Sequence, residues 1–172
     1  MKKNQNKIKA VALIGLCASL ALLLSYVEHL LPPLFVAVPG IKMGLPNVVI
    51  LYVLYCMGVK RAALVSFVRI ALVTMLFGTP MTLAYSVTGA VLSLLVMTVL
   101  KKMNFLSALG VSVAGGICHN IGQVLAAMVL LDTPQIAYYL LVLSVTGIVS
   151  GAFIGLCSAY LINRIPYAKI VK

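Results

Sequence analysis

Acidic side chains are almost absent from this chain of 172 residues, in which Glu28 and Asp132 are the only two. This excludes a site built on paired carboxylates, and also an aspartate-rich motif of the kind that holds a magnesium-bound diphosphate. The sequence has no Walker A glycine loop and suggests no Ser–His–acid arrangement. We therefore predict a protein that is not an enzyme and has no ATP site of its own.

Cysteine is present but lacks the spacing of a metal or disulfide site. Cys17, Cys56, Cys118 and Cys157 are scattered through apolar segments, and none belongs to a CxxC pair. A structural metal site needs such paired ligands, and the chain has only two histidines to add to them. We predict that the protein binds no metal and no cofactor.

Polar residues are too few to cover a soluble globule. Hydrophobic residues make up 63% of the sequence, and the mean hydropathy is +1.18. A soluble domain is typically about half apolar. We therefore predict a single integral membrane domain over residues 1–172. Its amino end is basic and then apolar, as in a signal peptide, but the apolar run continues to about residue 31, which favours a retained first helix.

Six apolar segments, separated by charged or helix-breaking residues, predict a bundle of six transmembrane helices. The predicted helices cover about residues 8–31, 46–58, 61–77, 81–100, 106–131 and 136–162. A spanning helix needs roughly 20 apolar residues, so the second and third segments are short for a full crossing.

Basic residues lie almost entirely on one side of this predicted topology. Eleven of the 13 lysines and arginines precede the first helix, follow the sixth, or lie in the connections between the second and third and the fourth and fifth. They are Lys2, Lys3, Lys7, Lys9, Lys60, Arg61, Lys101, Lys102, Arg164, Lys169 and Lys172. The positive-inside rule then predicts that both termini are cytoplasmic. The net charge of +11 is thus a topology signal and a contact with anionic membrane lipid, and we predict no nucleic-acid binding.

Glycines recur at helical spacing in the sixth segment, where Gly147, Gly151 and Gly155 form a GxxxGxxxG series. Small residues allow helix backbones to approach closely inside a membrane. The series predicts a close helical neighbour along this face, either within the molecule or in a partner.

Polar side chains inside the apolar segments are few, and each needs a partner, water or a ligand at membrane depth. Arg69 is near the middle of the third segment, where an arginine costs at least about 2.5 kcal/mol on insertion scales. It is either a fork for an anionic or carbonyl group of a ligand, or a structural tie to helix-end carbonyls or to Glu28.

The fifth segment carries a second polar group of residues, HNIGQ. His119 and Gln123 are four residues apart and Asn120 and Gln123 three apart, so they share one side of a helix. They form either a wall that faces a ligand or a set of hydrogen bonds between helices.

Residues 38–52, VPGIKMGLPNVVILY, interrupt the apolar sequence between the first and second segments, on the predicted external side. Lys42 is basic on the side that otherwise lacks basic residues, and Asn47 begins the second segment. Glu28 ends the first segment on the same side. Together with Arg69 and the HNIGQ patch, these residues predict an outward-facing pocket that binds a small solute.

Three stretches together resemble the bacterial Gx transporter family, which is often labelled heptaprenyl diphosphate synthase component I. They are PGIKMGLPNVVILYVLYCMG, FVRIALVTMLFGTPMTLAYSVTGAVLSLLVM and VSVAGGICHNIGQVLAAMVLL, and the similarity covers roughly residues 10 to 163. The Gx group in turn resembles the substrate-binding S components of energy-coupling factor (ECF) vitamin transporters. The resemblance implies a multi-pass protein of the bacterial cytoplasmic membrane with the six-helix S-component fold.

The same resemblance implies capture of a vitamin-like or cofactor-precursor solute, with transport driven by a membrane T component and two ATPase subunits. Small residues of the first helix contact the T component in such proteins. The corresponding positions here are Ala10, Ile14 and Ala18, with Gly15 and Ser19 as an alternative face. Two other functions stay open: a membrane accessory protein that binds a prenyl diphosphate or quinone precursor, and a structural partner without a ligand.

Overall fold

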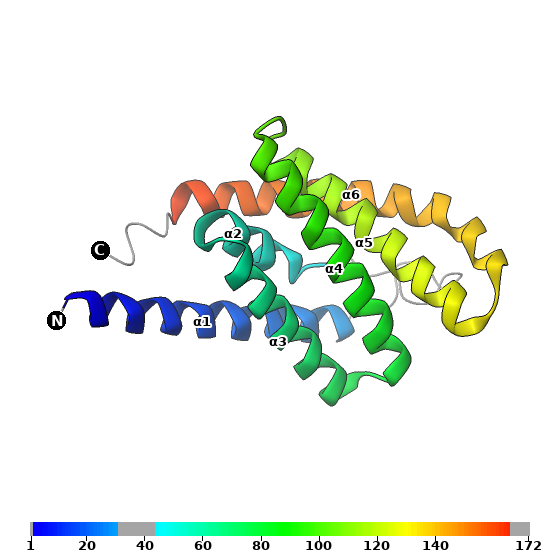
Figure 1. The fold of residues 1–172 in the computed structure, drawn as a ribbon, viewed down its shortest axis with the longest axis horizontal. Helices are drawn as coiled ribbons and strands as arrows, with labels where there is room; N and C mark the ends of the chain where they lie inside the picture. Colours follow the sequence, from blue (N-terminus) through cyan, green and yellow to red (C-terminus); the bar gives the residue numbers. More distant parts are fainter. Residues whose placement is uncertain (1, 31–43, 166–172) are drawn as a thin grey trace.

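The computed structural model describes residues 2–30 and 44–165, and these residues form helices and short connections. As predicted, six α-helices form, and their order is shown in Figure 1. They are α1 (Lys2–Leu30), α2 (Asn47–Met57), α3 (Val59–Phe77), α4 (Pro80–Met103), α5 (Ala108–Leu131) and α6 (Leu140–Arg164). A 3-10 helix, η1 (Pro134–Tyr139), leads directly into α6.

Four of these elements are long and apolar enough to cross a membrane, namely α1, α4, α5 and the continuous η1–α6 segment. Helix α2 has only 11 residues and is therefore roughly 16 Å long, about half the thickness of the hydrocarbon layer. Helix α3 has 19 residues but includes Lys60, Arg61 and Arg69. The chain thus has the helices of a multi-pass membrane protein, whereas the predicted count of six crossings is not confirmed.

Helix α2 forms the centre of the main hydrophobic cluster. Its residues 49–54 are all buried, and they pack with Ala21 of α1, Val65 of α3 and Val111 of α5. A helix that is apolar on every side is stable only when other elements surround it. The short second segment is therefore an interior helix.

Polar contacts hold α2 in this interior position. Ser158 of α6 donates a hydrogen bond to the Val48 carbonyl at 3.0 Å. At the other end of α2, the Lys101 ammonium donates to the Leu54 carbonyl at 2.7 Å and lies 5.0 Å from the centre of the Tyr55 ring. A cation at a helix C-terminus satisfies carbonyls that have no partner within the helix and complements the helix dipole.

Helices α5 and α6 approach each other along the glycine series of the sixth segment. A Cβ atom at Gly147 would lie 3.1 Å from the Gly116 carbonyl oxygen, and one at Gly151 would lie 2.8 Å from the Val113 Cα. A Cβ atom at Gly155 would lie 2.8 Å from the Leu109 Cα. These three glycines therefore face a helix of the same molecule.

The ends of several helices follow from local sequence. Thr79 and Thr82 cap the start of α4 reciprocally, and Pro80 occupies its first turn, where a missing N–H has no cost. Asn104 ends α4 in the left-handed conformation, with φ of 51°. Gly58 separates α2 from α3 at φ of 92°, a value that favours glycine.

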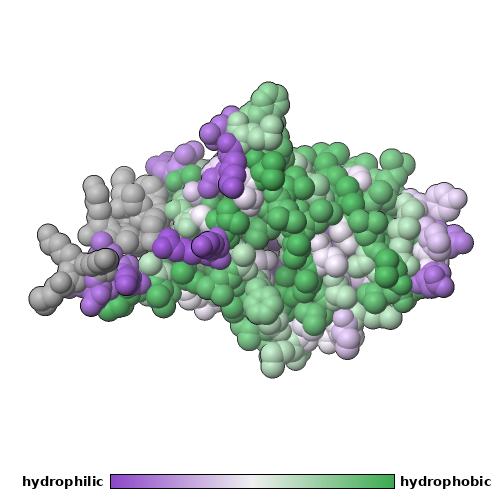
Figure 2. Space-filling view, in the orientation of Figure 1, coloured by the Kyte–Doolittle hydropathy of each residue, from purple (hydrophilic) through white to green (hydrophobic). Residues whose placement is uncertain are grey.

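The start of α1 and the end of α6 lie at the same end of the bundle (Figure 1). Figure 2 shows a broad hydrophobic surface over the middle of the molecule on this face. Hydrophilic side chains gather mainly toward the end where α1 begins and beside the α5–α6 turn (Figure 2). On this face, the distribution is the one expected where lipid contacts the middle of a membrane protein.

Candidate functional site

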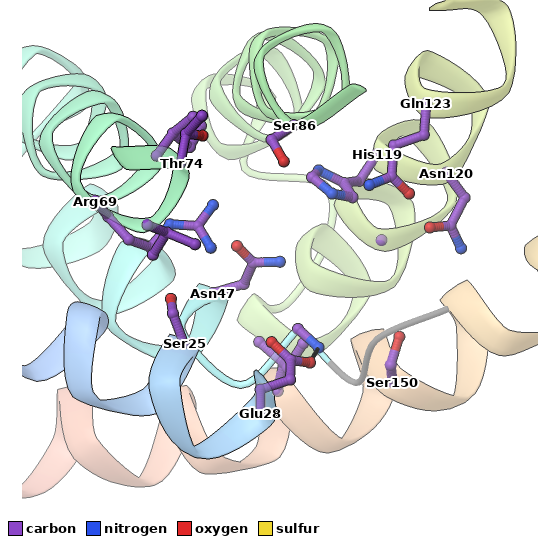
Figure 3. Close-up of a pocket in the computed structure, with 15 residues that line it drawn as sticks. Ser25, Glu28, Asn47, Arg69, Thr74, Ser86, His119, Asn120, Gln123 and Ser150 are labelled. Atoms are coloured by element: carbon purple, nitrogen blue, oxygen red, sulfur yellow. Dashed lines mark hydrogen bonds between the residues drawn. The ribbon is translucent and has the colours of Figure 1, made fainter. Parts of the chain in front are cut away.

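A polar cavity of about 100 Å³ lies where α1 ends, α2 begins and the middle parts of α3, α5 and α6 approach the first turns of α4. Figure 3 shows polar side chains from all six helices around this space. They are Ser25, Glu28, Asn47, Arg69, Thr74, Ser86, His119, Asn120, Gln123 and Ser150. A cavity of this size has room for several water molecules or a small solute group.

Six of the seven residues predicted to bind a solute line this one cavity: Glu28, Asn47, Arg69, His119, Asn120 and Gln123. The seventh, Lys42, lies outside the described residues. The six residues come from four different helices, so no local sequence relationship places them together. Their common feature is polarity within apolar segments, and burial in a shared cavity spares each of them contact with hydrocarbon.

Arg69 extends from the middle of α3, and its guanidinium group points into the cavity toward Asn47 (Figure 3). Its Nε atom is buried and has no hydrogen-bond partner among the described residues. Glu28 is within electrostatic reach of the guanidinium group. A buried donor without an acceptor is costly, so this atom marks a place where a ligand group or water is expected.

His119 and Gln123 lie on the side of α5 that meets α4 at Gly89. A Cβ atom at Gly89 would lie 3.0 Å from His119 Cε1 and 3.0 Å from Gln123 Cγ. Glycine at this point leaves room for both side chains to lie against the α4 backbone. Their polar ends then face the cavity, with the His119 ring directed toward Ser86 (Figure 3).

Asn120 has a different role from its neighbours on α5. Its amide nitrogen donates a hydrogen bond to the Leu143 carbonyl of α6. The same nitrogen would lie 3.0 Å from a Cβ atom at Gly147. The absence of a side chain at Gly147 therefore leaves room for the Asn120 amide beside α6. Asn120 therefore lines the cavity and also ties α5 to α6. The second role is the hydrogen bonding between helices that the sequence offered as an alternative to ligand binding.

Glu28 is buried near the end of α1 and accepts a hydrogen bond from the backbone N–H of Gly44. Gly44 has φ of +74° and its carbonyl accepts from the Asn47 N–H at 2.8 Å, which forms the turn that starts α2. This left-handed conformation favours glycine. The acid of the cavity is thus anchored to the turn that presents Asn47.

Four hydroxyl residues of the cavity wall were missed by sequence reasoning: Ser25, Thr74, Ser86 and Ser150. Serine and threonine are tolerated within membrane helices because they can bond to their own helix backbone. Ser25, for example, donates to the Ala21 carbonyl at 2.8 Å. Their occurrence in an apolar segment therefore carries little signal for a site.

The predicted docking face of α1 is divided between the interior and the surface. Ala10 is buried, and Ile14 and Ala18 pack against the hydrophobic cluster around α2. Gly15 and Ser19 are exposed, and a Cβ atom at Gly15 would meet no atom within 4 Å. Within this chain, the alternative face of Gly15 and Ser19 is the one that is open to a neighbour.

Comparison with known families identifies the family of this chain. The model of a family described as heptaprenyl diphosphate synthase component I matches residues 17–161, which is most of the chain. The chain belongs to this family. The matched range of the family includes every described residue that was predicted to bind a solute. A search of curated proteins and a search of solved structures found no match.

The family description names a synthase component, and the described residues of the cavity indicate which chemistry they can support. Among the described residues, no group of three or more histidine, cysteine, aspartate or glutamate side chains could hold a metal ion. Glu28 is the acid among the described residues that line the cavity. The cavity can therefore bind and orient a polar group through hydrogen bonds and the Arg69 charge.

Proposed function

We propose that this chain is a non-enzymatic membrane subunit that captures a small solute, acting as the S component of an ECF-type importer. The solute would be a vitamin-like compound or a cofactor precursor that enters from outside a bacterial cytoplasmic membrane. The observation that carries this proposal is the buried Arg69 Nε without a hydrogen-bond partner in a cavity lined by polar groups. A polar cluster that only ties helices together would satisfy its buried donors internally.

Capture also fits what surrounds the cavity. Polar side chains from six helices converge on one space, which is the arrangement of a small-molecule site built between helices. The chain has no ATP-binding motif, so energy for transport would come from a membrane T component and two ATPase subunits. The exposed Gly15 and Ser19 on α1 offer a face where a T-component helix could approach closely.

A second candidate function is favoured by the family description. A membrane accessory protein of isoprenoid metabolism would bind a prenyl diphosphate or a quinone precursor. An open apolar groove between α4 and α5, lined by residues such as Val91, Leu95 and Leu125, would suit the hydrocarbon part of such a molecule. The polar cavity would then have to hold its headgroup.

Co-purification distinguishes the two functions. The tagged chain is co-expressed with an ECF T component and its ATPases, purified in mild detergent and analysed for proteins and small molecules by mass spectrometry. Stoichiometric recovery of the ATPases supports the importer. Recovery of a prenyl synthase or a prenyl lipid without ATPases supports the accessory role.

A pair of variants makes this test specific for α1. Gly15→Leu adds bulk at an exposed position on the candidate docking face, where an added Cβ atom would have no neighbour within 4 Å. Ala137→Leu places the same side chain at an exposed position in η1. We expect Gly15→Leu to lose the T component and ATPases and Ala137→Leu to retain them. Equal recovery with both variants would place the docking surface elsewhere.

A further inference from the structure

Three polar side chains of the cavity have hydrogen-bonding groups that no described residue satisfies. The Arg69 Nε is buried without a partner, and the side-chain amides of Asn47 and Gln123 make no hydrogen bond to a described residue. Asn120 differs from them, because its amide nitrogen donates to the Leu143 carbonyl. Polar groups inside a membrane protein need a partner, so the three unsatisfied ones are the groups through which an occupant would be held.

The three groups differ in what they offer an occupant. The Arg69 guanidinium can only donate hydrogen bonds, whereas each side-chain amide has a carbonyl oxygen that accepts and an NH₂ group that donates. Arg69 points toward Asn47, so a donor from α3 faces an amide at the start of α2 (Figure 3). Gln123 adds a second amide from α5. An occupant that satisfies this lining must therefore both accept and donate hydrogen bonds.

A group that only accepts hydrogen bonds satisfies this lining in part. An ionised carboxylate could accept from Arg69, but it has no hydrogen to donate to the side-chain carbonyl of Asn47. A buried acceptor that is left unpaired costs free energy. A neutral amide edge, in which a carbonyl oxygen and an N–H group are adjacent, supplies both an acceptor and a donor. Cyclic amides, cyclic ureas and pyrimidine-type rings have such an edge.

The size of the cavity agrees with the recognition of one small polar group. Its volume is about 100 Å³, whereas roughly 300 to 1,000 Å³ is typical of a site that encloses a drug-sized ligand. Asn47 and Arg69 belong to separate helices, and the buried part of α2 is packed on all sides by other elements. The donor and the acceptor are therefore held by packed helices, which suits the recognition of a fixed edge.

We propose that the captured solute presents a neutral amide edge to this cavity, with its carbonyl oxygen accepting from the Arg69 Nε and its adjacent N–H donating to the Asn47 side-chain carbonyl. This proposal rests on the proposed capture function and names the class of solute, a cyclic amide, a cyclic urea or a pyrimidine-type ring. Arg69 binds the edge, and Asn47 selects it over groups that only accept hydrogen bonds.

Arginine-selective NMR tests the proposal, because the chain has only three arginines. Protein labelled with ¹⁵N-arginine in nanodiscs gives three Nε–H signals, and the signal that is lost in Arg69→Lys belongs to Arg69. Arg61 and Arg164 serve as internal references, since they lie at the start of α3 and the end of α6. The probes are pyrrolidinone, which has the amide edge, butyrolactone, in which a ring oxygen replaces the N–H, and acetate, which only accepts.

We expect pyrrolidinone to shift the Arg69 signal with saturation in the millimolar range, as suits so small a ligand. Butyrolactone should bind on the order of 10-fold more weakly, because its ring oxygen leaves the Asn47 carbonyl unpaired. Acetate should also bind more weakly than pyrrolidinone. In Asn47→Leu, the preference for pyrrolidinone over butyrolactone should disappear. Asn163→Leu makes the same change at an exposed position in α6 and should retain the preference.

The wild-type protein alone can overturn the proposal, so the test does not depend on the folding of Asn47→Leu. The proposal is wrong if no probe gives a saturable shift confined to Arg69, if pyrrolidinone and butyrolactone bind equally, or if acetate binds more tightly than pyrrolidinone. A preference that persists in folded Asn47→Leu would also refute it.

The co-purification experiment fails independently of these results. A saturable shift that favours pyrrolidinone, without recovered ATPases, would keep the amide site and reject the importer. Recovered ATPases, together with tighter binding of acetate than of pyrrolidinone, would keep the importer and reject the amide edge.

Discussion

Substitution of Gly116 by alanine should separate α5 from α6 and destabilise the protein. The added Cβ atom would lie 2.6 Å from the Gly147 carbonyl oxygen, 0.8 Å short of the 3.4 Å at which ordinary contact begins. The obstacle is backbone, so no side chain can rotate away. Overpacking of this kind costs about 1–3 kcal/mol, while alanine gains roughly 0.5–1 kcal/mol over glycine within a helix. The net loss of stability should be about 1–2 kcal/mol.

Gly15→Ala is the matched control for this prediction. Both glycines lie within α-helices, but a Cβ atom at Gly15 would have no neighbour within 4 Å. The same chemical change should there be neutral or stabilising by up to about 1 kcal/mol. The difference between the two variants isolates the steric cost at the α5–α6 contact.

Thermal unfolding in detergent measures both variants. The chain has no tryptophan, so a maleimide dye that reacts with cysteines exposed on unfolding is the suitable probe. All four cysteines are buried or half-buried in helices. A loss of 1–2 kcal/mol lowers Tm by about 2–8 °C in a protein of this size. If Gly116→Ala and Gly15→Ala shift Tm equally, the close approach of α5 and α6 does not exist as described.

Two further predictions concern hydrogen bonds that tie helices together. Lys101→Met removes the hydrogen bond to the Leu54 carbonyl and should lower stability by about 1–2 kcal/mol. Lys102→Met, at the exposed neighbouring position, is the control and should leave stability unchanged. Equal melting temperatures of the two variants would contradict the role of Lys101 at the end of α2. Asn120→Ala should lower thermal stability by about 1 kcal/mol through loss of its bond to α6. Gln123→Ala should have a smaller effect on Tm, because Gln123 makes no hydrogen bond to another helix among the described residues; an equal or larger fall in Tm would contradict this difference between the two residues.

The sequence predicted the helices well because the physical signals were strong and local. Long apolar runs, separated by charges, glycine and proline, defined six helices, and all six form. The role of α2 could not be read in the same way. Apolar residues on every side suit lipid and protein interior equally, so only the three-dimensional arrangement shows that residues 49–54 are buried by other helices.

The cavity residues that could be predicted from the sequence are those whose side chains are rare within apolar helices. Arg69 and Gln123 stood out because such side chains are costly within apolar helices, and the structure places both at the same cavity. Thr74 and Ser86 did not stand out, since hydroxyl residues can satisfy themselves on their own helix. Ile14 was named as a docking residue only through the family resemblance; it is half-buried against the cluster around α2, and its docking role stays a prediction.

The short interior helix has a consequence for how the chain is assembled in the membrane. Helix α2 is about half as long as the hydrocarbon layer is thick and cannot be retained there by its own length. Its Val48 carbonyl is bonded by Ser158 and its Tyr52 hydroxyl donates to the Ile165 carbonyl, partners that are synthesised more than 100 residues later. These two hydrogen bonds of α2 can therefore form only after α6 has been made. The polar contacts of a helix made early in synthesis are thus completed by the last helix of the chain.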